Sequence, residues 1–492
     1  MFSEIKSLIK HGSIYTIGNI LSKIASFLLI PIYTNYLIPS EYGTLELLDL
    51  TIDMIATVLG MGMAIAVMRY YSKAEDKKSK NLVLSSALIG IITLMGLTSA
   101  ICIVFSPLFS KIIFSSEQYT YFFRIIFLTM FLHSGIGMSI VFLRAKLKSG
   151  TFVTLNLIKL IIQLSLNIYF LVALGLGVLG VLYSGLITSF IFFTYLLIST
   201  FRETGTKFSF KTYKLLLKFG APLIIADLSI FLLTFADRFF LNYFCDLNIV
   251  GIYSLAYKFG MLVAMLICGP FWAIWSVKMF ELAKQDNAQE LFSKTMNYFL
   301  MGALTISLAL AILTKDVLRL MANSSYWEAY KIVPLISTSY VLQGFIGIAG
   351  AGILIKGKTK YKAISSFAAM AANLLLNYLF IPIWGGFGAA FATLIAFGVR
   401  LLIDFYYSQR LFYINYDWKK IMLMTGMYLF LALTAFYVDI ENLIISVAIN
   451  ILILFMFPIS LYIFGILEPK EKNIIRSFVN NPFKSLKTIL KT

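Results

Sequence analysis

Long apolar segments, separated by short polar breaks, follow one another along the 492 residues of this sequence. A helix needs about 20 mainly apolar residues to cross the roughly 30 Å of hydrocarbon in a bilayer. Because a backbone in hydrocarbon must satisfy its own hydrogen bonds, these segments are predicted to be helices, and the alternating pattern of barrel strands is not seen. We therefore predict an all-α integral membrane protein with about 14 transmembrane helices. Their expected limits are residues 12–38, 45–70, 82–109, 120–143, 151–174, 179–201, 219–244, 251–277, 295–318, 331–355, 363–384, 389–412, 421–438 and 444–464.

The composition supports the same class of protein. Hydrophobic residues make up 60% of the chain and charged residues 13%, whereas soluble domains have about half and a quarter. The net charge is +18, but the basic residues lie between apolar segments and do not form the single patch beside aromatic residues that binds nucleic acid. Three widely separated cysteines and two histidines provide neither a disulfide framework nor a metal site. No nucleic acid partner and no cofactor are expected.

Lysine and arginine gather in alternate polar breaks, which indicates the orientation of the chain. They are concentrated at residues 73–80, 144–148, 202–218, 278–294, 356–362 and 470–491, and are absent from 39–43, 245–250 and 385–388. Basic loops are retained on the cytoplasmic side of the membrane. Both termini are therefore expected to be cytoplasmic. The first ten residues lead into an apolar segment without a small-residue cleavage site, so we expect an uncleaved first span.

An internal repeat has an offset of about 208 to 210 residues. The matched positions are Leu8–Gly12 with Leu216–Gly220, Gly43 with Gly251, Leu166-Asn167 with Leu376-Asn377, and Gly175 with Gly385. An even number of spans in each copy makes the copies parallel, as in one class of transporters, whose halves alternately open a central cleft. We expect two pseudo-symmetric six-helix lobes around a central cavity, at residues 1–210 and 211–415. Residues 416–492 would add two spans and a basic cytoplasmic tail.

Five basic residues lie inside the predicted spans: Lys23, Lys159, Arg238, Lys258 and Arg400. A charge at mid-membrane costs about 2.5 to 3.5 kcal/mol on insertion scales, so such residues indicate protein-facing or water-facing sites. Lysine and arginine both bind phosphate strongly. A pyrophosphate head group therefore suits this set of cations better than a cationic drug does, and the five residues are candidate substrate-binding residues.

Six acidic residues inside the spans are candidates for ion coupling, with H⁺ or Na⁺ as the counter-ion, or for structural roles. They are Glu46, Asp49, Asp53, Asp227, Asp237 and Asp404. The first three share one helix face, and their pairing with Lys23 is an alternative to phosphate binding by that lysine. Arg400 and Asp404 have the i, i+4 spacing of a simple pair. Asp237 and Arg238 are not expected to pair, because adjacent helical residues point in different directions, and Asp237 is expected to fix helix packing.

Four motifs carry a resemblance to a known family. They are the Pro39–Gly43 loop, Ala236–Leu241, Gly251–Lys258 and the Asn377–Thr393 stretch, and their order and spacing extend over the first twelve spans. With these motifs the chain resembles the polysaccharide or O-antigen flippases of the multidrug/oligosaccharidyl-lipid/polysaccharide exporter superfamily.

The resemblance implies a fold of two six-helix lobes around a cationic cavity, plus two extra helices. It also implies that an oligosaccharide repeat unit on undecaprenyl pyrophosphate crosses the bacterial cytoplasmic (inner) membrane by alternating access, for O-antigen, capsule or related polysaccharide assembly. By similarity, Lys23, Arg238 and Lys258 would hold the pyrophosphate. Membrane lipids and a polysaccharide polymerase machinery are the further partners that it suggests.

Two transporter alternatives remain open: a lipid II flippase for peptidoglycan, and a cation-coupled multidrug exporter. Lipid II flippases are richer in arginine through the first spans, and the excess of cations within the spans argues against a cationic drug. A lipid-linked glycan enzyme is not expected, because the chain has no large outer loop and no cluster of catalytic histidine or cysteine.

Overall fold

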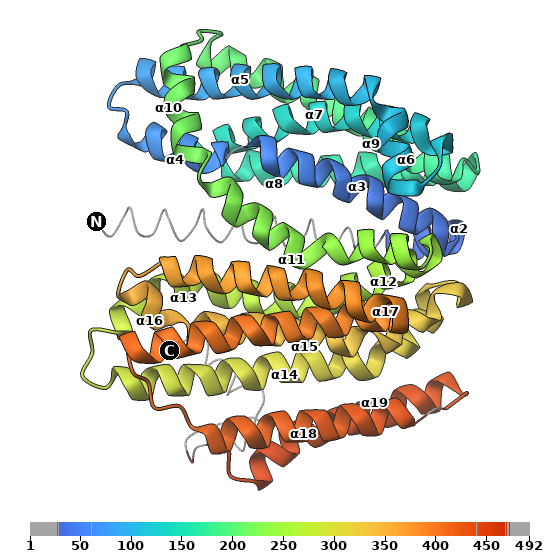
Figure 1. Cartoon of the computed structure of the whole chain (residues 1–492), viewed down its shortest axis with the longest axis vertical. Coiled ribbons are helices and arrows are strands. Elements are labelled where there is room, and N and C mark those ends of the chain that lie inside the picture. The colour runs from blue at the N-terminus through green and yellow to red at the C-terminus, as the bar shows by residue number, and fades with distance from the viewer. Residues whose placement is uncertain are drawn as a thin grey trace. The chain divides into compact units, whose positions relative to one another are not determined.

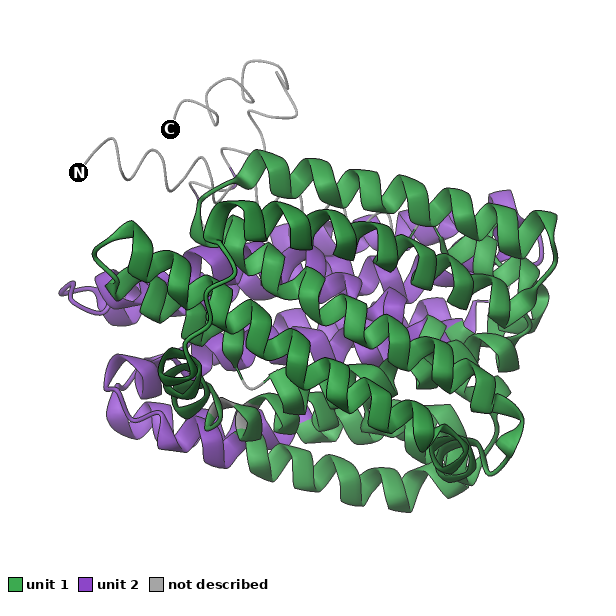
Figure 2. Cartoon of the chain, turned by 90° about the horizontal axis from the view of Figure 1, so that it is seen from above, with its two compact units in different colours: residues 1–255, 321–329, 366–396 green, residues 256–320, 330–365, 397–492 purple. Residues whose placement is uncertain are grey.

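The computed structural model describes residues 27, 29–60, 62–438, 440–467, 469 and 472. Every regular element in these residues is helical (Figure 1). The chain divides into two compact units, coloured separately in Figure 2. Unit 1 comprises the described residues up to Leu255 together with Met321–Ala329 and Ser366–Ala396, and unit 2 comprises Ala256–Leu320, Tyr330–Ser365 and the described residues from Phe397 onward. The predicted lobe limits at residues 210 and 415 stay a prediction.

The helices of unit 1 are α2 (Ile30–Tyr36), α3 (Pro39–Gly60), α4 (Met63–Lys73), α5 (Lys77–Val104), α6 (Ser106–Phe114), η1 (Glu117–Tyr119), α7 (Thr120–Ala145), α8 (Ser149–Asn167), the π-helix η2 (Ile168–Ala173), α9 (Gly177–Thr204), α10 (Phe210–Gly220) and α11 (Leu223–Phe244). α12 (Leu247–Gly260) runs from unit 1 into unit 2. Unit 2 continues with the π-helix η3 (Ala264–Cys268), α13 (Gly269–Leu282), α14 (Ala288–Met321), α15 (Val333–Ala349), α16 (Ala351–Ile355), α18 (Trp418–Tyr437) and α19 (Leu443–Ile463). The 3-10 helix η4 (Ser324–Lys331) and α17 (Lys360–Leu411) contribute to both units.

Eleven helices of the described chain are long and apolar enough to cross a membrane, as expected of a multi-pass protein. The second to the fourteenth predicted spans are largely helical, although several run over two or three consecutive helical elements, and the first span lies mainly outside the described residues. α11 does not belong to the eleven, since Asp227, Asp237 and Arg238 lie within its 22 residues. α17 combines two predicted spans. The all-helical membrane fold is therefore confirmed, while the count of about 14 is not.

Gly385 separates the two predicted spans that α17 contains. Its backbone has φ +53° and ψ −131°, a non-helical conformation inside the helix. A residue with a Cβ rarely adopts such a positive φ, whereas glycine does so without steric cost. The sequence boundary between residues 384 and 389 therefore corresponds to a glycine kink.

Two repeat-related glycines of unit 1 lie against each other, near the N-terminal ends of α3 and α12. A Cβ added to Gly43 would lie 2.2 Å from the Leu247 carbonyl oxygen, and one added to Gly251 would lie 2.0 Å from the Pro39 carbonyl oxygen. The backbones of the two helices are thus in direct contact at this crossing, as small residues permit between membrane helices.

Buried hydrogen bonds attach α18 and α19 to the rest of unit 2. The Tyr428 hydroxyl lies 3.0 Å from Ser307 Oγ on α14 and 2.7 Å from Thr338 Oγ1 on α15. On α19, Ser446 Oγ and Asn450 Nδ2 donate to the two carboxylate oxygens of Asp316 over 2.8 and 2.7 Å. Asp316 is 2% exposed. The last two helices are therefore an integral part of the packed unit.

Candidate functional site

A buried ion pair in unit 1 connects α11 and α12. Arg238 Nη1 donates to Asp237 Oδ1 over 2.6 Å and to the Thr234 carbonyl oxygen over 2.8 Å, and the Tyr253 hydroxyl donates to Asp237 Oδ2. Asp237 and Arg238 are each 1% exposed. The Arg238 guanidinium also lies over the Tyr253 ring, 5.0 Å from its centroid. The charge of Arg238 is therefore balanced within the protein.

The expectation that Asp237 and Arg238 do not pair is wrong. Adjacent helical residues do leave the axis in different directions, but that rule describes Cβ positions. The long arginine side chain turns back along α11 far enough to reach both Thr234 and the neighbouring carboxylate. The tyrosine from α12 completes the coordination of Asp237. This arrangement suits the packing role predicted for Asp237.

A second buried carboxylate, Asp404, organises α17 in unit 2. It is fully buried, and it accepts hydrogen bonds from Lys362 Nζ over 2.8 Å and from Ser365 Oγ over 2.7 Å. Arg400, one turn from Asp404, is half-buried, and its Nε has no hydrogen-bond partner among the described residues. The carboxylate that could have paired with Arg400 is therefore bound by Lys362 and Ser365. This cluster holds two cations and one anion.

The other predicted cations are distributed over different helices. Lys159 on α8 and Lys258 on α12 are half-buried. Lys23 lies outside the described residues. The site residues predicted from the sequence thus do not form one cluster within either unit. Their role in substrate binding remains a prediction.

The acidic face of α3 is accessible. Glu46 is half-buried, while Asp49 and Asp53 are exposed, as is Asp227 on α11. Asp53 lines a cavity of about 290 Å³ in unit 1, together with His133 and Ser134 from α7. The predicted acids of α3 therefore include one that faces a defined cavity.

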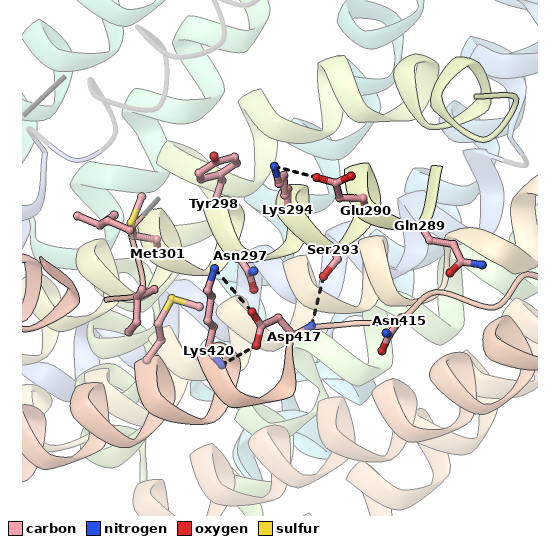
Figure 3. A pocket seen from close by; sticks show the side chains of 13 residues that line it. Gln289, Glu290, Ser293, Lys294, Asn297, Tyr298, Met301, Asn415, Asp417 and Lys420 are labelled. Atoms are coloured by element: carbon pink, nitrogen blue, oxygen red, sulfur yellow. Dashed lines mark hydrogen bonds and ion pairs between the residues drawn. The ribbon is translucent and has the colours of Figure 1, made fainter. Parts of the chain in front are cut away.

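A polar pocket of about 400 Å³ lies in unit 2, beside α14 and the first turn of α18 (Figure 3). Its charges are paired locally: Lys294 Nζ lies 3.0 Å from Glu290 Oε1, and Lys420 Nζ lies 3.6 Å from Asp417 Oδ2. Asp417 also caps α18 through a hydrogen bond from the Lys420 backbone N–H. The predicted cations of the described spans do not line this pocket. Its balanced charge makes it a poor match for a pyrophosphate group.

Sequence reasoning missed Lys362 and His133. The basic residues at 356–362 predict a cytoplasmic loop that includes Lys362, whereas its ammonium group reaches Asp404, 42 residues away in sequence. The sequence expectations for histidine concern metal binding alone and leave out His133. A search for every ionisable residue within the spans, applied to histidine as well as to lysine and arginine, would have found His133.

Comparison with known proteins agrees with this fold. The family model described as "Polysaccharide biosynthesis protein" matches residues 8–275. Protein 1 of the Lsg locus from Haemophilus influenzae is 26% identical over 401 residues, which make up 77% of this chain and 94% of that protein. A Haloferax volcanii protein named as a probable low-salt glycan biosynthesis flippase, Agl15, is 22% identical over 301 residues, or 60% of this chain and 62% of that protein. A Shigella flexneri protein named as an O-antigen transporter is 21% identical over 242 residues, or 48% of this chain and 56% of that protein.

Two solved structures share the architecture. The lipid II flippase MurJ in an inward closed conformation superposes with a TM-score of 0.74 at 16% identity, covering 92% of this chain and 99% of that one. An inward-facing multidrug resistance transporter of the MATE family has a TM-score of 0.62 at 17% identity, covering 79% and 94%. At these identities the similarity concerns the fold. The chain belongs to the polysaccharide biosynthesis protein family, and it is a multi-pass membrane protein with the fold of MurJ and the MATE transporters.

Proposed function

We propose that this protein is a flippase that moves an oligosaccharide repeat unit, linked to undecaprenyl pyrophosphate, across the bacterial cytoplasmic membrane. Family membership and the relatives named as a glycan flippase and an O-antigen transporter support a polysaccharide cargo. The assembled product would be O-antigen, capsule or a related surface polysaccharide. Relatives named for glycan export support this function over the lipid II and multidrug alternatives.

The single observation that carries the proposal is the excess of positive charge around Asp404. Arg400 and Lys362 share this one buried carboxylate, which accepts hydrogen bonds from Lys362 and Ser365 while Arg400 Nε has no hydrogen-bond partner among the described residues. Holding a cation within a membrane span costs about 2.5 to 3.5 kcal/mol on insertion scales. An anionic ligand would offset that cost, because hydrogen bonds from a guanidinium to phosphate strengthen away from bulk water.

The described cations can be ranked for this role. Arg238 is 1% exposed and bound to Asp237, so a phosphate would have to displace a buried ion pair. Breaking such a pair is strongly unfavourable. Arg400 and Lys159, both half-buried, are therefore stronger candidates for the pyrophosphate than Arg238. Lys23 and Lys258 complete the proposed set.

The proposed mechanism is alternating access between two lobes, residues 1–210 and 211–415. The pyrophosphate and glycan would enter a central cavity from the cytoplasmic side, while the lipid tail stays in the bilayer. Both termini would be cytoplasmic, as the basic loops predict. Consumption of the product by a polymerase outside, or counter-transport of H⁺ or Na⁺ through the acidic residues, would drive net movement.

The test uses a host strain that lacks this gene and measures surface polysaccharide together with the lipid-linked intermediate. Loss of one charge-assisted phosphate contact costs about 1.5 to 3 kcal/mol. Arg400→Ala should therefore reduce export by about tenfold or more and increase the intermediate in the membrane. Arg400→Lys should retain part of the activity, because it keeps the charge but loses the guanidinium geometry.

Arg410→Ala is the matched control. Arg410 lies near the end of the same helix, and its exposed guanidinium stacks on Tyr406 at 4.4 Å from the ring centroid. Its replacement should leave export unchanged. Normal export by Arg400→Ala, at wild-type protein levels, would contradict the proposed role of Arg400. Loss of peptidoglycan synthesis without loss of surface polysaccharide would instead indicate a lipid II flippase.

A further inference from the structure

The short helix α10 of unit 1 has one face packed on the protein and one face exposed. It connects α9 to α11 and runs across the beginning of α5 rather than alongside that helix (Figure 1). On the packed face Leu216 is fully buried, and a Cβ added to Gly90 of α5 would lie 2.2 Å from Tyr213 Cε2. With 11 residues, α10 is too short to cross a bilayer. Its opposite face stays exposed, so the side chains on that face decide what it can bind.

Three lysines occupy the exposed face of α10. Lys211, Lys214 and Lys218 follow the i, i+3, i+7 spacing of a single helix face, and all three are exposed. Phe210 and Leu215 each lie four residues from one of these lysines and are 69% and 45% exposed. We call these five residues the basic face of α10. Lysines beside large apolar side chains are typical of a helix at a membrane surface, where the charges contact head groups and the apolar groups enter the interface.

The charge of the basic face is not balanced by nearby acidic residues. Neither α10 nor the segments that join it to α9 and α11 contain an acidic residue. Glu203, near the end of α9, accepts hydrogen bonds from Lys146 and Lys148. No lysine of the basic face forms an ion pair with a described residue. The terminal segments outside the described residues, 1–26 and 473–492, are themselves basic. An anionic partner from outside this chain is therefore the charge complement of this face.

α10 is held close to the ends of membrane spans. Both α5 and α9 are long and apolar enough to cross a membrane. Ser85 Oγ on α5 donates to the Lys207 carbonyl oxygen over 2.6 Å, and the Ser209 backbone N–H donates to Ser86 Oγ over 3.0 Å. Residues 205–209, which join α9 to α10, reach at most about 17 Å. The basic face therefore lies at the membrane surface, where anionic lipids attract lysine side chains.

We propose that the basic face of α10 binds the head groups of anionic phospholipids in the surrounding bilayer. The lysine ammonium groups contact the lipid phosphates, and Phe210 and Leu215 enter the interface between head groups and acyl chains. These apolar side chains, together with the position at the ends of spans, favour a lipid surface over a soluble acidic partner. Because none of the proposed substrate-binding cations belongs to this face, lipid binding here does not depend on which cargo the protein carries.

The experiment measures lipid binding to the full-length protein by native mass spectrometry, in neutral detergent micelles titrated with phosphatidylglycerol or phosphatidylcholine. The wild-type protein should bind the anionic phosphatidylglycerol more tightly. Because each lysine near an anionic surface contributes about a fivefold factor in affinity, the variant Lys211→Gln/Lys214→Gln/Lys218→Gln should weaken phosphatidylglycerol binding by about tenfold or more. Its phosphatidylcholine binding should be unchanged, which also shows that the variant is folded. Phe210→Ala keeps every charge and should weaken binding of both lipids, because it removes apolar contact.

The matched control is Lys356→Gln/Lys358→Gln/Lys360→Gln, which removes the same charge from exposed lysines around the start of α17 and should change the phosphatidylglycerol affinity by less than about twofold. Millimolar inorganic phosphate at constant ionic strength should not displace the lipid. Equal losses in the two triple variants, or displacement by phosphate, would overturn the proposal. Equal affinity of the wild type for the two lipids would also overturn it and would indicate a soluble acidic partner for this face. The measurement involves no transport, so failure of the flippase proposal would leave its result unchanged.

Discussion

The Asp237–Arg238 pair allows a quantitative test of how the fold holds a buried charge. Both side chains are 1% exposed, and the pair is reinforced by the Thr234 carbonyl and the Tyr253 hydroxyl. Asp237→Ala leaves a buried guanidinium without its anion, which should lower the free energy of unfolding by about 3 to 5 kcal/mol. Arg238→Met leaves a carboxylate that still accepts from Tyr253 and can bind a proton, so its cost should be smaller.

The double variant Asp237→Ala/Arg238→Met distinguishes a buried pair from two independent contacts. It removes both charges and fills most of the arginine volume, so its stability should approach that of the wild type. The cycle of single and double variants should give a coupling energy of about 2 kcal/mol or more. The assay is reversible unfolding of the purified protein in mixed micelles, followed by tryptophan fluorescence. Additive losses in the double variant would refute the reasoning.

Three further substitutions test the packing of the helices. Gly251→Ala places a Cβ 2.0 Å from the Pro39 carbonyl oxygen. It should destabilise the protein by about 1 to 3 kcal/mol in the same unfolding assay. The control is Gly185→Ala, which has no atom within 4 Å of the added Cβ and should be neutral or slightly stabilising. Gly385→Ala should lower the free energy of unfolding by about 1 to 3 kcal/mol because of its φ of +53°. Gly426→Ala on α18, where an added Cβ has no atom within 4 Å, should not lower it. Equal effects of the two substitutions would contradict the kink argument. Asp316→Ala should remove the acceptor of two buried hydrogen bonds from α19 and increase hydrogen exchange in that helix at least tenfold; unchanged exchange would show that apolar packing alone holds it.

Much of the fold could be predicted because membrane spans follow from local composition. The helices α14, α18 and α19 lie close to the predicted spans 295–318, 421–438 and 444–464, since each is a single apolar run between polar breaks. The kink of α17 is also detectable from the sequence, because its glycine-rich stretch predicts a boundary between two spans. Hydropathy alone does not give the number of spans. α11 carries three charged residues, and α17 contains two predicted spans.

The candidate site was less predictable, because its contacts depend on tertiary structure. The i, i+4 rule could suggest Arg400 as the partner of Asp404, but it could not identify Lys362, which comes from 42 residues earlier and reaches the same carboxylate. In the same way, the reach of Arg238 around its own helix follows from side-chain length and from the tyrosine on α12, neither of which a helical spacing rule includes. Residue types were identified from the sequence, and their partners required the structure.

The contact between Gly43 and Gly251 has a consequence for movement within unit 1. Where large side chains interlock, one helix can shift against another only if rotamers rearrange together, and each rearrangement adds a barrier. At this crossing the two helices meet through their backbones, and the carbonyl oxygens of Leu247 and Pro39 are the atoms nearest to Gly43 and Gly251. α3 and α12 can therefore change their crossing angle at this point without rearranging side chains, and separating them there exposes little apolar surface.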